Sequence, residues 1–411
     1  MKRFFLLTLA SAALLGASAA PVKTYEVKSP DGRLALVLTA GERLSFTVAR
    51  DGETLVAPSE MALTLSTGEV LGESPRVRSA RRRAVTETID APLYRQSRFD
   101  AAYNELDLRL RGDYGILARA YDDGVCYRFY TERDGELTIV DETAQLNFEG
   151  DPSAYIPYSK TEIPMRTSFE NTYEYAPLSK FRTQTVAFMP VLVDLGERGY
   201  VLYTESDVEA YPGVYLTYDK EAKGFAARFA EYPTETSLTK RFQDVVERSA
   251  DYIARVDGRR SYPWRIVAYA ATATELPVND MVWQTAEASR VADASWVRDG
   301  KIAWDWWNNW GLYGVDFKSG INTETYKYFI DFAAANGIEY VALDEGWGVR
   351  DGDVMHVVPE IDLPEIVSYA REKKVGIILW VVAKVLDDKL EEACRYYSEL
   401  GVAGWKVDFI D

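Results

Sequence analysis

The last third of the chain alternates apolar strands with helices, and this pattern restricts the fold more than any other feature. Strands are indicated at 302–306, 339–343, 376–382 and 402–409, with helices between them at 322–336, 363–373 and 387–400. Strands that alternate with helices form a parallel sheet, because each helix returns the chain to the same edge. Residues 376–382 are apolar throughout, as expected of a strand covered on both faces. Residues 280–411 are therefore predicted to form the first half of a (β/α)8 barrel.

A complete barrel of this kind takes roughly 250 residues. The sequence stops at Asp411, on the fourth expected strand. We therefore expect the chain to be part of a longer protein, because half a barrel leaves an edge strand unpaired. A helix over 280–297 is expected to lead into the first barrel strand.

Residues 21–279 have a different pattern, made of short strands separated by turns. Apolar runs occur at 34–38, 44–48 and 61–65, and Asp-Gly pairs stand at 31–32 and 51–52. Asp-Gly is a frequent turn sequence between paired strands. This region is predicted to form a large β-sandwich that precedes the barrel.

Residues 1–20 have the features of a secretory signal peptide. Lys2 and Arg3 precede an apolar run over 4–15, and small residues follow at 17–20. The apolar run is too short to span a bilayer, and no later stretch is long enough. The sequence therefore predicts a periplasmic or secreted protein without membrane insertion.

Composition excludes several classes of partner and site. The formal net charge of −17 argues against binding to nucleic acid or to anionic membranes. His356 is the single histidine, which excludes a metal site built on several histidines and disfavours Ser-His-Asp hydrolysis. Cys126 and Cys394 fall in different expected domains, so two buried free thiols are expected; the alternative is a bridge between them in an oxidising compartment. Acid–base chemistry is left to carboxylates, and any metal should be a hard, oxygen-bound cation such as Ca²⁺.

Three of the expected barrel strands end in aromatic and charged residues. These are residues 304–310, Asp344 to Trp347, and Lys406 to Asp408. Barrel enzymes place their chemistry at the carboxyl ends of the strands, where these groups should meet. Tryptophan faces stack on sugar rings, and paired carboxylates hydrolyse glycosidic bonds. A sugar site is predicted; the alternatives are that the tryptophans pack a core and that Asp408 is an ordinary loop residue.

A second candidate lies in the sandwich region. Residues 169–175 place two glutamates, Glu170 and Glu174, in an aromatic loop. The loop either is simply solvated or supplies a carboxylate to a neighbouring site.

Taken together, these stretches resemble glycoside hydrolase family 97, a family of exported α-glycosidases. The resemblance rests on residues 295–307, 340–347 and 404–409, supported by 120–124 and 169–173. It implies a β-super-sandwich, then a (β/α)8 barrel of which this chain holds the first half, then a small C-terminal β-domain outside this sequence.

The resemblance also implies an activity. The family contains inverting α-glucosidases and retaining α-galactosidases, and Asp408 in its Lys-x-Asp-Phe setting matches the nucleophile of the retaining branch. The implied function is an exo-acting α-galactosidase that hydrolyses terminal α-galactosyl residues of oligosaccharides. The Glu acid/base of the family would lie beyond Asp411.

Further residues are implied by the resemblance with less support. The family binds one Ca²⁺, and its sandwich-derived ligand matches Glu170 best and Glu174 less well, with the remaining ligands beyond Asp411. Asp344, Trp347 and Lys406 are implied as sugar contacts by analogy with related α-galactosidase barrels. The alternatives are an inverting α-glucosidase and a non-catalytic carbohydrate-binding protein; the oligomeric state is open.

Overall fold

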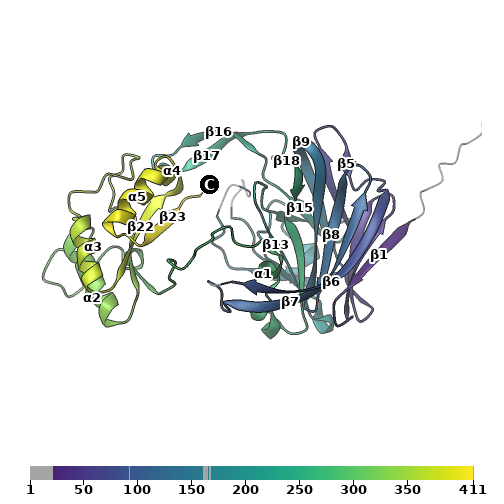
Figure 1. Cartoon of the computed structure of the whole chain (residues 1–411), viewed down its shortest axis with the longest axis horizontal. Helices are drawn as coiled ribbons and strands as arrows, with labels where there is room; N and C mark the ends of the chain where they lie inside the picture. Colours follow the sequence, from purple (N-terminus) through teal and green to yellow (C-terminus); the bar gives the residue numbers. More distant parts are fainter. Residues whose placement is uncertain (1–21, 92, 161–164, 166–167, 411) are drawn as a thin grey trace, which may run out of the picture. The chain divides into compact units, whose positions relative to one another are not determined.

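A computed structural model describes residues 22–91, 93–160, 165 and 168–410. The contacts divide them into two compact units, which are described separately (Figure 1). The first unit comprises residues 22–91, 98–230 and 252–286, and the second comprises 93–97, 231–251 and 287–410. The predicted signal peptide lies outside the described residues.

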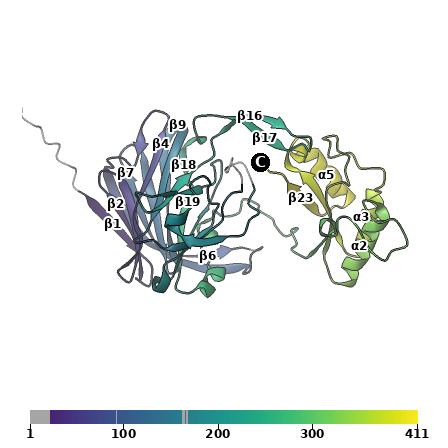
Figure 2. The same cartoon turned by 180° about the vertical axis from the view of Figure 1, so that it is seen from behind.

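The first unit is built almost entirely from antiparallel strands, which curve round a large apolar core, with a smaller apolar cluster beside it (Figures 1 and 2). Its strands are β1 (Lys23–Lys28), β2 (Leu34–Ala40), β3 (Leu44–Arg50), β4 (Glu53–Leu65), β5 (Val70–Leu71), β6 (Val77–Asp90), β7 (Arg98–Leu110), β8 (Tyr114–Tyr121), β9 (Gly124–Asn147), β10 (Ser153–Ile156), β11 (Glu174–Pro177), β12 (Val191–Asp194), β13 (Tyr200–Ser206), β14 (Tyr215–Asp219), β15 (Gly224–Arg228), β18 (Ala254–Ser261) and β19 (Trp264–Ala270). Short helices are η2 (Leu178–Lys180), η3 (Gly196–Arg198), η4 (Ala273–Val278) and α1 (Met281–Thr285). The predicted β-sandwich is confirmed.

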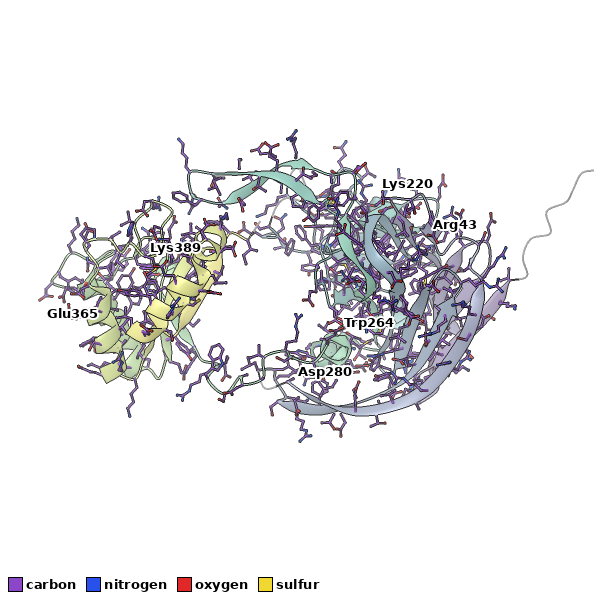
Figure 3. All side chains as sticks on the ribbon, turned by 45° about the horizontal axis from the view of Figure 1, so that its top comes forward. Arg43, Lys220, Trp264, Asp280, Glu365 and Lys389 are labelled. Atoms are coloured by element: carbon purple, nitrogen blue, oxygen red, sulfur yellow. The ribbon has the colours of Figure 1, made fainter. Side chains whose placement is uncertain are left out.

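Strand β9 holds this unit together. It is 24 residues long and pairs along its length with β4, β8, β15, β18 and β19. Alternate residues of the paired strands point inward, as in β2, where every second side chain is buried. Trp264 on β19 lies fully inside the unit (Figure 3).

The core of the first unit contains a buried ion cluster. Arg265 on β19 donates from Nε and Nη2 to the two carboxylate oxygens of Glu142, both at 2.8 Å. Its Nη1 donates to Glu205 at 2.5 Å, and the Tyr211 hydroxyl donates to Glu142 at 2.9 Å. The Arg265 side chain is 1% exposed, so these carboxylates replace the water that the guanidinium has lost.

The second unit contains a parallel sheet in the order β20-β21-β22-β23. Its elements are β20 (Ile302–Trp304), η5 (Asp305–Asn308), α2 (Thr323–Ala335), β21 (Tyr340–Leu343), α3 (Leu363–Glu372), β22 (Gly376–Val382), α4 (Ala383–Asp387), α5 (Leu390–Leu400) and β23 (Gly404–Asp408). Helix α2 begins after Asn322, whose side chain accepts from the Thr325 amide, and α5 ends at Gly401 in a left-handed conformation. The predicted first half of a (β/α)8 barrel is confirmed.

Each strand of this sheet has one face toward the helices. Val341, Leu343, Ile377, Leu379 and Val381 pack against apolar residues of α2, α3 and α5. Polar residues such as Glu365 lie on the outer surface of the helices (Figure 3). Because side chains alternate along a strand, Trp380, between the buried Leu379 and Val381, lies on the opposite face. Lys406 and Asp408 of β23 contact it there.

A hairpin from the sandwich part of the sequence belongs to the second unit. Strands β16 (Pro233–Leu238) and β17 (Asp244–Ser249) pair with each other, and residues 231–251 cluster with the half barrel. The second unit is therefore discontinuous in sequence, whereas the expected division was a single break between 279 and 280.

Two expected helices differ in the structure. The helix over 280–297 is wrong beyond Thr285: α1 ends there, and Ala286 is extended. Residues 286–297 are almost entirely exposed in the structure, so a helix there would have no buried face, which is the main source of helix stability. The helix over 387–400 is interrupted at Lys389, so that α4 and α5 are separate.

Two absences follow for the described residues. Cys126 lies on β9 and Cys394 on α5, and both are free thiols. Cys126 is buried as expected, whereas Cys394 is only partly buried. No helix in the described part of the chain is long and apolar enough to cross a membrane.

Candidate functional site

The carboxyl ends of the four parallel strands form an edge that we call the rim. Asp305 and Asp344 follow β20 and β21 directly, and Asp408 ends β23. The Asp344 amide donates to Oδ1 of Asp305 at 3.2 Å, and the Trp304 indole N–H donates to Oδ2 of Asp344 at 2.6 Å. The structure therefore brings together the rim residues that the sequence placed on separate strands.

Lys406 joins two of these carboxylates. Its Nζ lies 2.8 Å from Oδ2 of Asp408 and 3.3 Å from Oδ2 of Asp344. The ammonium group also lies 5.0 Å from the centre of the Trp304 ring and 6.0 Å from that of Trp380. One cation thus offsets the repulsion between two neighbouring anions.

Asp408 is held at both oxygens. Oδ2 accepts from Lys406 and, at 3.0 Å, from the Trp380 indole N–H, while Oδ1 accepts from the Phe409 amide at 2.9 Å. Partial burial would by itself raise the pKa of Asp408, but these hydrogen bonds and the charge of Lys406 lower it below the usual value. Asp408 is therefore ionised at neutral pH and fixed in orientation.

Exposure separates Asp408 from the other rim carboxylates. Asp305 is fully buried and the Asp344 side chain is 4% exposed, whereas the Asp408 side chain is 42% exposed. Burial raises the pKa of Asp305 to about 6, against hydrogen bonds from the Tyr326 hydroxyl and the Asp344 amide. Asp305 and Asp344 thus support the rim, and Asp408 is the carboxylate that a ligand can reach.

Trp380 is a site residue that the sequence reasoning missed. It lies in the apolar strand β22, which was interpreted as covered on both faces. In the sheet it pairs in register with Lys406, and its N–H reaches Asp408. Its register with Lys406 across two parallel strands is the signal that could have identified it.

The predicted sugar contacts occupy three different positions. Lys406 lies beside Asp408. Asp344 is paired with Lys406 on the buried side of the rim, and both of its carboxylate oxygens accept hydrogen bonds. Trp347 is 3% exposed; its indole N–H donates to the Trp380 carbonyl at 2.8 Å, and its ring packs edge-on against Tyr397. The role of these residues in sugar binding stays a prediction. The exposed tryptophans directly after β20 are Trp306 and Trp307.

Glu170 lies in the first unit, on an exposed part of the loop. Its carboxylate is 74% exposed and lies 3.8 Å from the Lys160 ammonium, whereas Glu174 pairs with Arg182. Among the residues that the structure describes, no three His, Cys, Asp or Glu side chains are grouped so as to hold a metal. Glu170 can therefore supply one hard oxygen ligand, which suits Ca²⁺ but does not by itself make a site.

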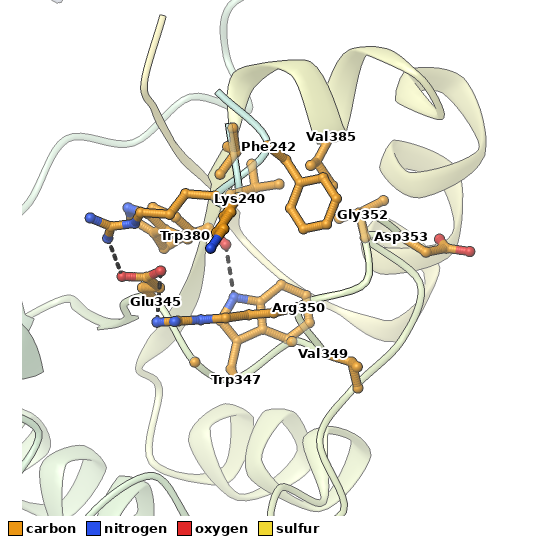
Figure 4. Close-up of a pocket in the computed structure, with 16 residues that line it drawn as sticks. Lys240, Phe242, Glu345, Trp347, Val349, Arg350, Gly352, Asp353, Trp380 and Val385 are labelled. Carbon is orange, nitrogen blue, oxygen red and sulfur yellow. Dashed lines mark hydrogen bonds and ion pairs between the residues drawn. The ribbon is translucent and has the colours of Figure 1, made fainter. Parts of the chain in front are cut away.

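A pocket lies beside the rim, between the tip of the β16–β17 hairpin and the loop after β21 (Figure 4). We call it the hairpin pocket, and its walls include Lys240, Arg241, Phe242, Trp347, Trp380 and Val385. Glu345 stands at its edge, paired with Arg241 at 2.6 Å and Arg350 at 2.9 Å. With its open mouth, the hollow measures about 550 Å³.

Comparison with known proteins places both units in one family. The family description "Glycosyl-hydrolase 97 N-terminal" matches residues 27–287, and "Glycoside hydrolase 97" matches residues 306–411. A retaining alpha-galactosidase of Bacteroides thetaiotaomicron is 42% identical over 398 residues, which cover 95% of this chain and 60% of that protein. A probable retaining alpha-galactosidase of Streptomyces bingchenggensis is 31% identical, over 93% of this chain and 56% of that protein.

Solved structures agree on the fold. A glycoside hydrolase family 97 enzyme from Pseudoalteromonas sp. strain K8, in complex with acarbose, superposes with a TM-score of 0.78 at 19% identity, covering 94% of this chain and 59% of that one. A beta-arabinopyranosidase superposes with a TM-score of 0.74 at 21% identity, covering 94% and 62%. The chain thus spans about three fifths of the length of these relatives. With both family descriptions matched in order along its length, the chain belongs to glycoside hydrolase family 97.

Proposed function

We propose that the protein is an exo-acting, retaining α-galactosidase in which Asp408 is the nucleophile. The observation that carries the proposal is that the Asp408 carboxylate is fixed by three hydrogen bonds, one of them from the Lys406 ammonium group, and is exposed at the rim. The similarity to proteins named as retaining alpha-galactosidases supports the substrate class.

In this proposal the reaction is a double displacement. The Asp408 carboxylate attacks the anomeric carbon of a terminal α-galactosyl residue, and the bond to the leaving oxygen breaks as the glycosyl ester forms. Water then attacks the same carbon from the opposite face and releases galactose with its α configuration. Lys406 and Trp380 hold Oδ2, which leaves the carboxylate oriented for attack.

The first step also requires an acid that protonates the leaving oxygen. Asp305 is fully buried, Asp344 is bound to Trp304 and Lys406, and Glu345 is bound to two arginines. We place the acid in the part of the relatives' length that this chain does not cover.

The test is proton NMR of the full-length protein as it hydrolyses an aryl α-galactoside. We expect α-galactose to appear before mutarotation produces the β anomer. If β-galactose appears first, water attacks directly, and Asp408 loses its role as nucleophile.

Lys406→Ala should shift the pH profile of this activity. Lys406 lowers the pKa of Asp408, so its removal raises that pKa, and a larger share of Asp408 is protonated in mildly acidic solution. The acid limb of kcat/KM, which reports the free enzyme, should therefore move to higher pH. The control is Lys373→Ala, which removes an exposed lysine paired with Asp331 and should leave the limb unchanged. An unmoved limb in Lys406→Ala would contradict the assignment.

We also propose Ca²⁺ as a cofactor, with Glu170 as one ligand from this chain. Its exposed carboxylate is a hard oxygen donor of the kind that Ca²⁺ prefers. Bound Ca²⁺ would supply positive charge to its site. Glu170→Gln should weaken Ca²⁺ binding in titration calorimetry and reduce the rise in melting temperature that Ca²⁺ produces, whereas Glu221→Gln should not. Equal binding by both variants would remove Glu170 from the site.

Residues 1–20 are proposed to direct export to the periplasm or the medium, where oligosaccharide substrates are encountered. The sequence of the first mature residues in the exported protein tests this directly. A mature protein that still begins at Met1 would contradict it.

A further inference from the structure

The hairpin pocket and the site at Asp408 share a wall. Trp380 donates its indole N–H to Asp408, and the same residue lines the pocket. Arg241 contributes a second connection, because its guanidinium lies 4.9 Å from the centre of the Phe409 ring while its Nη2 binds Glu345. The pocket therefore adjoins the residue proposed to form the covalent intermediate.

The tip of the hairpin is shaped so that its side chains face the half barrel. The Thr239 hydroxyl oxygen accepts from the amides of Arg241 and Gln243, which closes the turn. Phe242 adopts a left-handed backbone conformation with φ of 61°, which is unfavourable for a bulky residue. Its ring lies against Gly352, where even a Cβ atom would come within 2.9 Å of Phe242 Cε1 (Figure 4). Such strain persists where surrounding contacts impose it, and it is frequent at ligand sites.

The chemistry of the walls fits a sugar unit. Phe242 and Val385 are only partly buried and supply apolar surface, on which the C–H face of a pyranose can pack. Arg241 is half-exposed and uses one nitrogen on Glu345, so the guanidinium has further N–H donors for hydroxyl groups. The pocket opens to solvent on one side, so a sugar ring can rest against these walls without being enclosed by them.

We propose that the hairpin pocket is the subsite for the leaving group of the substrate, and that Arg241 determines preference for a sugar at that position. This inference rests on the function proposed above. The substrates that this subsite would favour are α-galactosides whose leaving group is a second sugar. Those whose leaving group is a small alcohol would not reach it.

The experiment compares two substrates in the full-length protein. One is an α-galactosyl glucose disaccharide, and the other is methyl α-galactoside, whose leaving group is too small to reach the pocket. Loss of a hydrogen bond from a charged group should lower kcat/KM of Arg241→Ala for the disaccharide roughly 10- to 100-fold. The value for the methyl galactoside should stay within about twofold of wild type, because Arg241 makes no hydrogen bond to Asp408 and the three groups that do are retained.

The matched control is Arg248→Ala, an exposed arginine of the same hairpin that pairs with Glu235 away from the pocket. It should leave both substrates unaffected. Arg241→Lys keeps the charge and should recover part of the disaccharide activity. Phe242→Ala should also act selectively on the disaccharide, and melting curves show whether each variant is folded.

Three outcomes would overturn the inference. Equal losses on both substrates in Arg241→Ala would mean that Arg241 supports the rim and not a leaving-group subsite. No difference between Arg241→Ala and Arg248→Ala would remove Arg241 from substrate binding. Wild-type protein that hydrolyses neither substrate would refute the proposed function itself, and with it the subsite.

Discussion

Asp408→Ala in the full-length protein should lower kcat for an aryl α-galactoside by roughly 10⁴- to 10⁶-fold, the range seen when other enzymes lose a nucleophile. The reason is that no other exposed carboxylate stands at the described rim: Asp305 and Asp344 are buried and hydrogen-bonded. Steady-state assay with a chromogenic galactoside measures the loss. Binding of galactose, measured by calorimetry, should persist, because Lys406 and the exposed tryptophans remain.

Azide provides the sharper form of this experiment. In Asp408→Ala the lost carboxylate leaves space beside the anomeric carbon, and azide can attack from the same side. The product should be β-galactosyl azide, identified by NMR. The control is Asp387→Ala, an exposed aspartate after β22, which should keep wild-type turnover without azide. Full activity in Asp408→Ala would rule out Asp408 as the nucleophile.

Arg265→Met should lower the free energy of unfolding by about 3–5 kcal/mol, the range observed when one partner of a buried ion pair is removed. Glu142 and Glu205 would remain as buried carboxylates without their cation. Glu205 is already disfavoured in its charged form, because burial raises its pKa. Urea denaturation of the full-length protein, followed by intrinsic fluorescence, measures the change.

Two further variants separate this effect from a general loss of an arginine. Arg259→Met removes an exposed arginine on β18 that pairs with Asp134, and it should cost no more than about 1 kcal/mol. Adding Glu142→Gln and Glu205→Gln to Arg265→Met should recover part of the stability, because neutral amides are less costly to bury. A loss as small as that of Arg259→Met would show that the cluster contributes little.

The sequence predicted the structure best where a single hydrophobic periodicity determines a strand or a helix. Strand β22 has the bounds that its apolar run predicted, and α2 lies within one residue of its predicted ends. Asp408 could be placed at the rim because parallel strands share an edge. These features depend on local patterns, which a single sequence displays.

The features that were missed depend on contacts between distant residues. Trp380 was hidden in a continuous apolar run, where alternation is invisible until β22 is set beside β23. Residues 231–251 read as further sandwich strands, and nothing local in them shows that Arg241 pairs with Glu345, more than a hundred positions away. The prediction of a helix after Thr285 was wrong, because helical propensity without a buried face is insufficient to stabilise a helix.

The hairpin also decides how this protein can be divided. A gene fragment that starts at residue 280 would encode the strands β20 to β23 without β16 and β17, so Glu345 would lose Arg241 and Gly352 would lose Phe242. Conversely, a fragment that ends near 279 would carry a two-stranded ribbon separated from its partner surface. Recombination at the apparent domain boundary would therefore produce two damaged pieces, and a transplantable catalytic module must include both stretches of sequence.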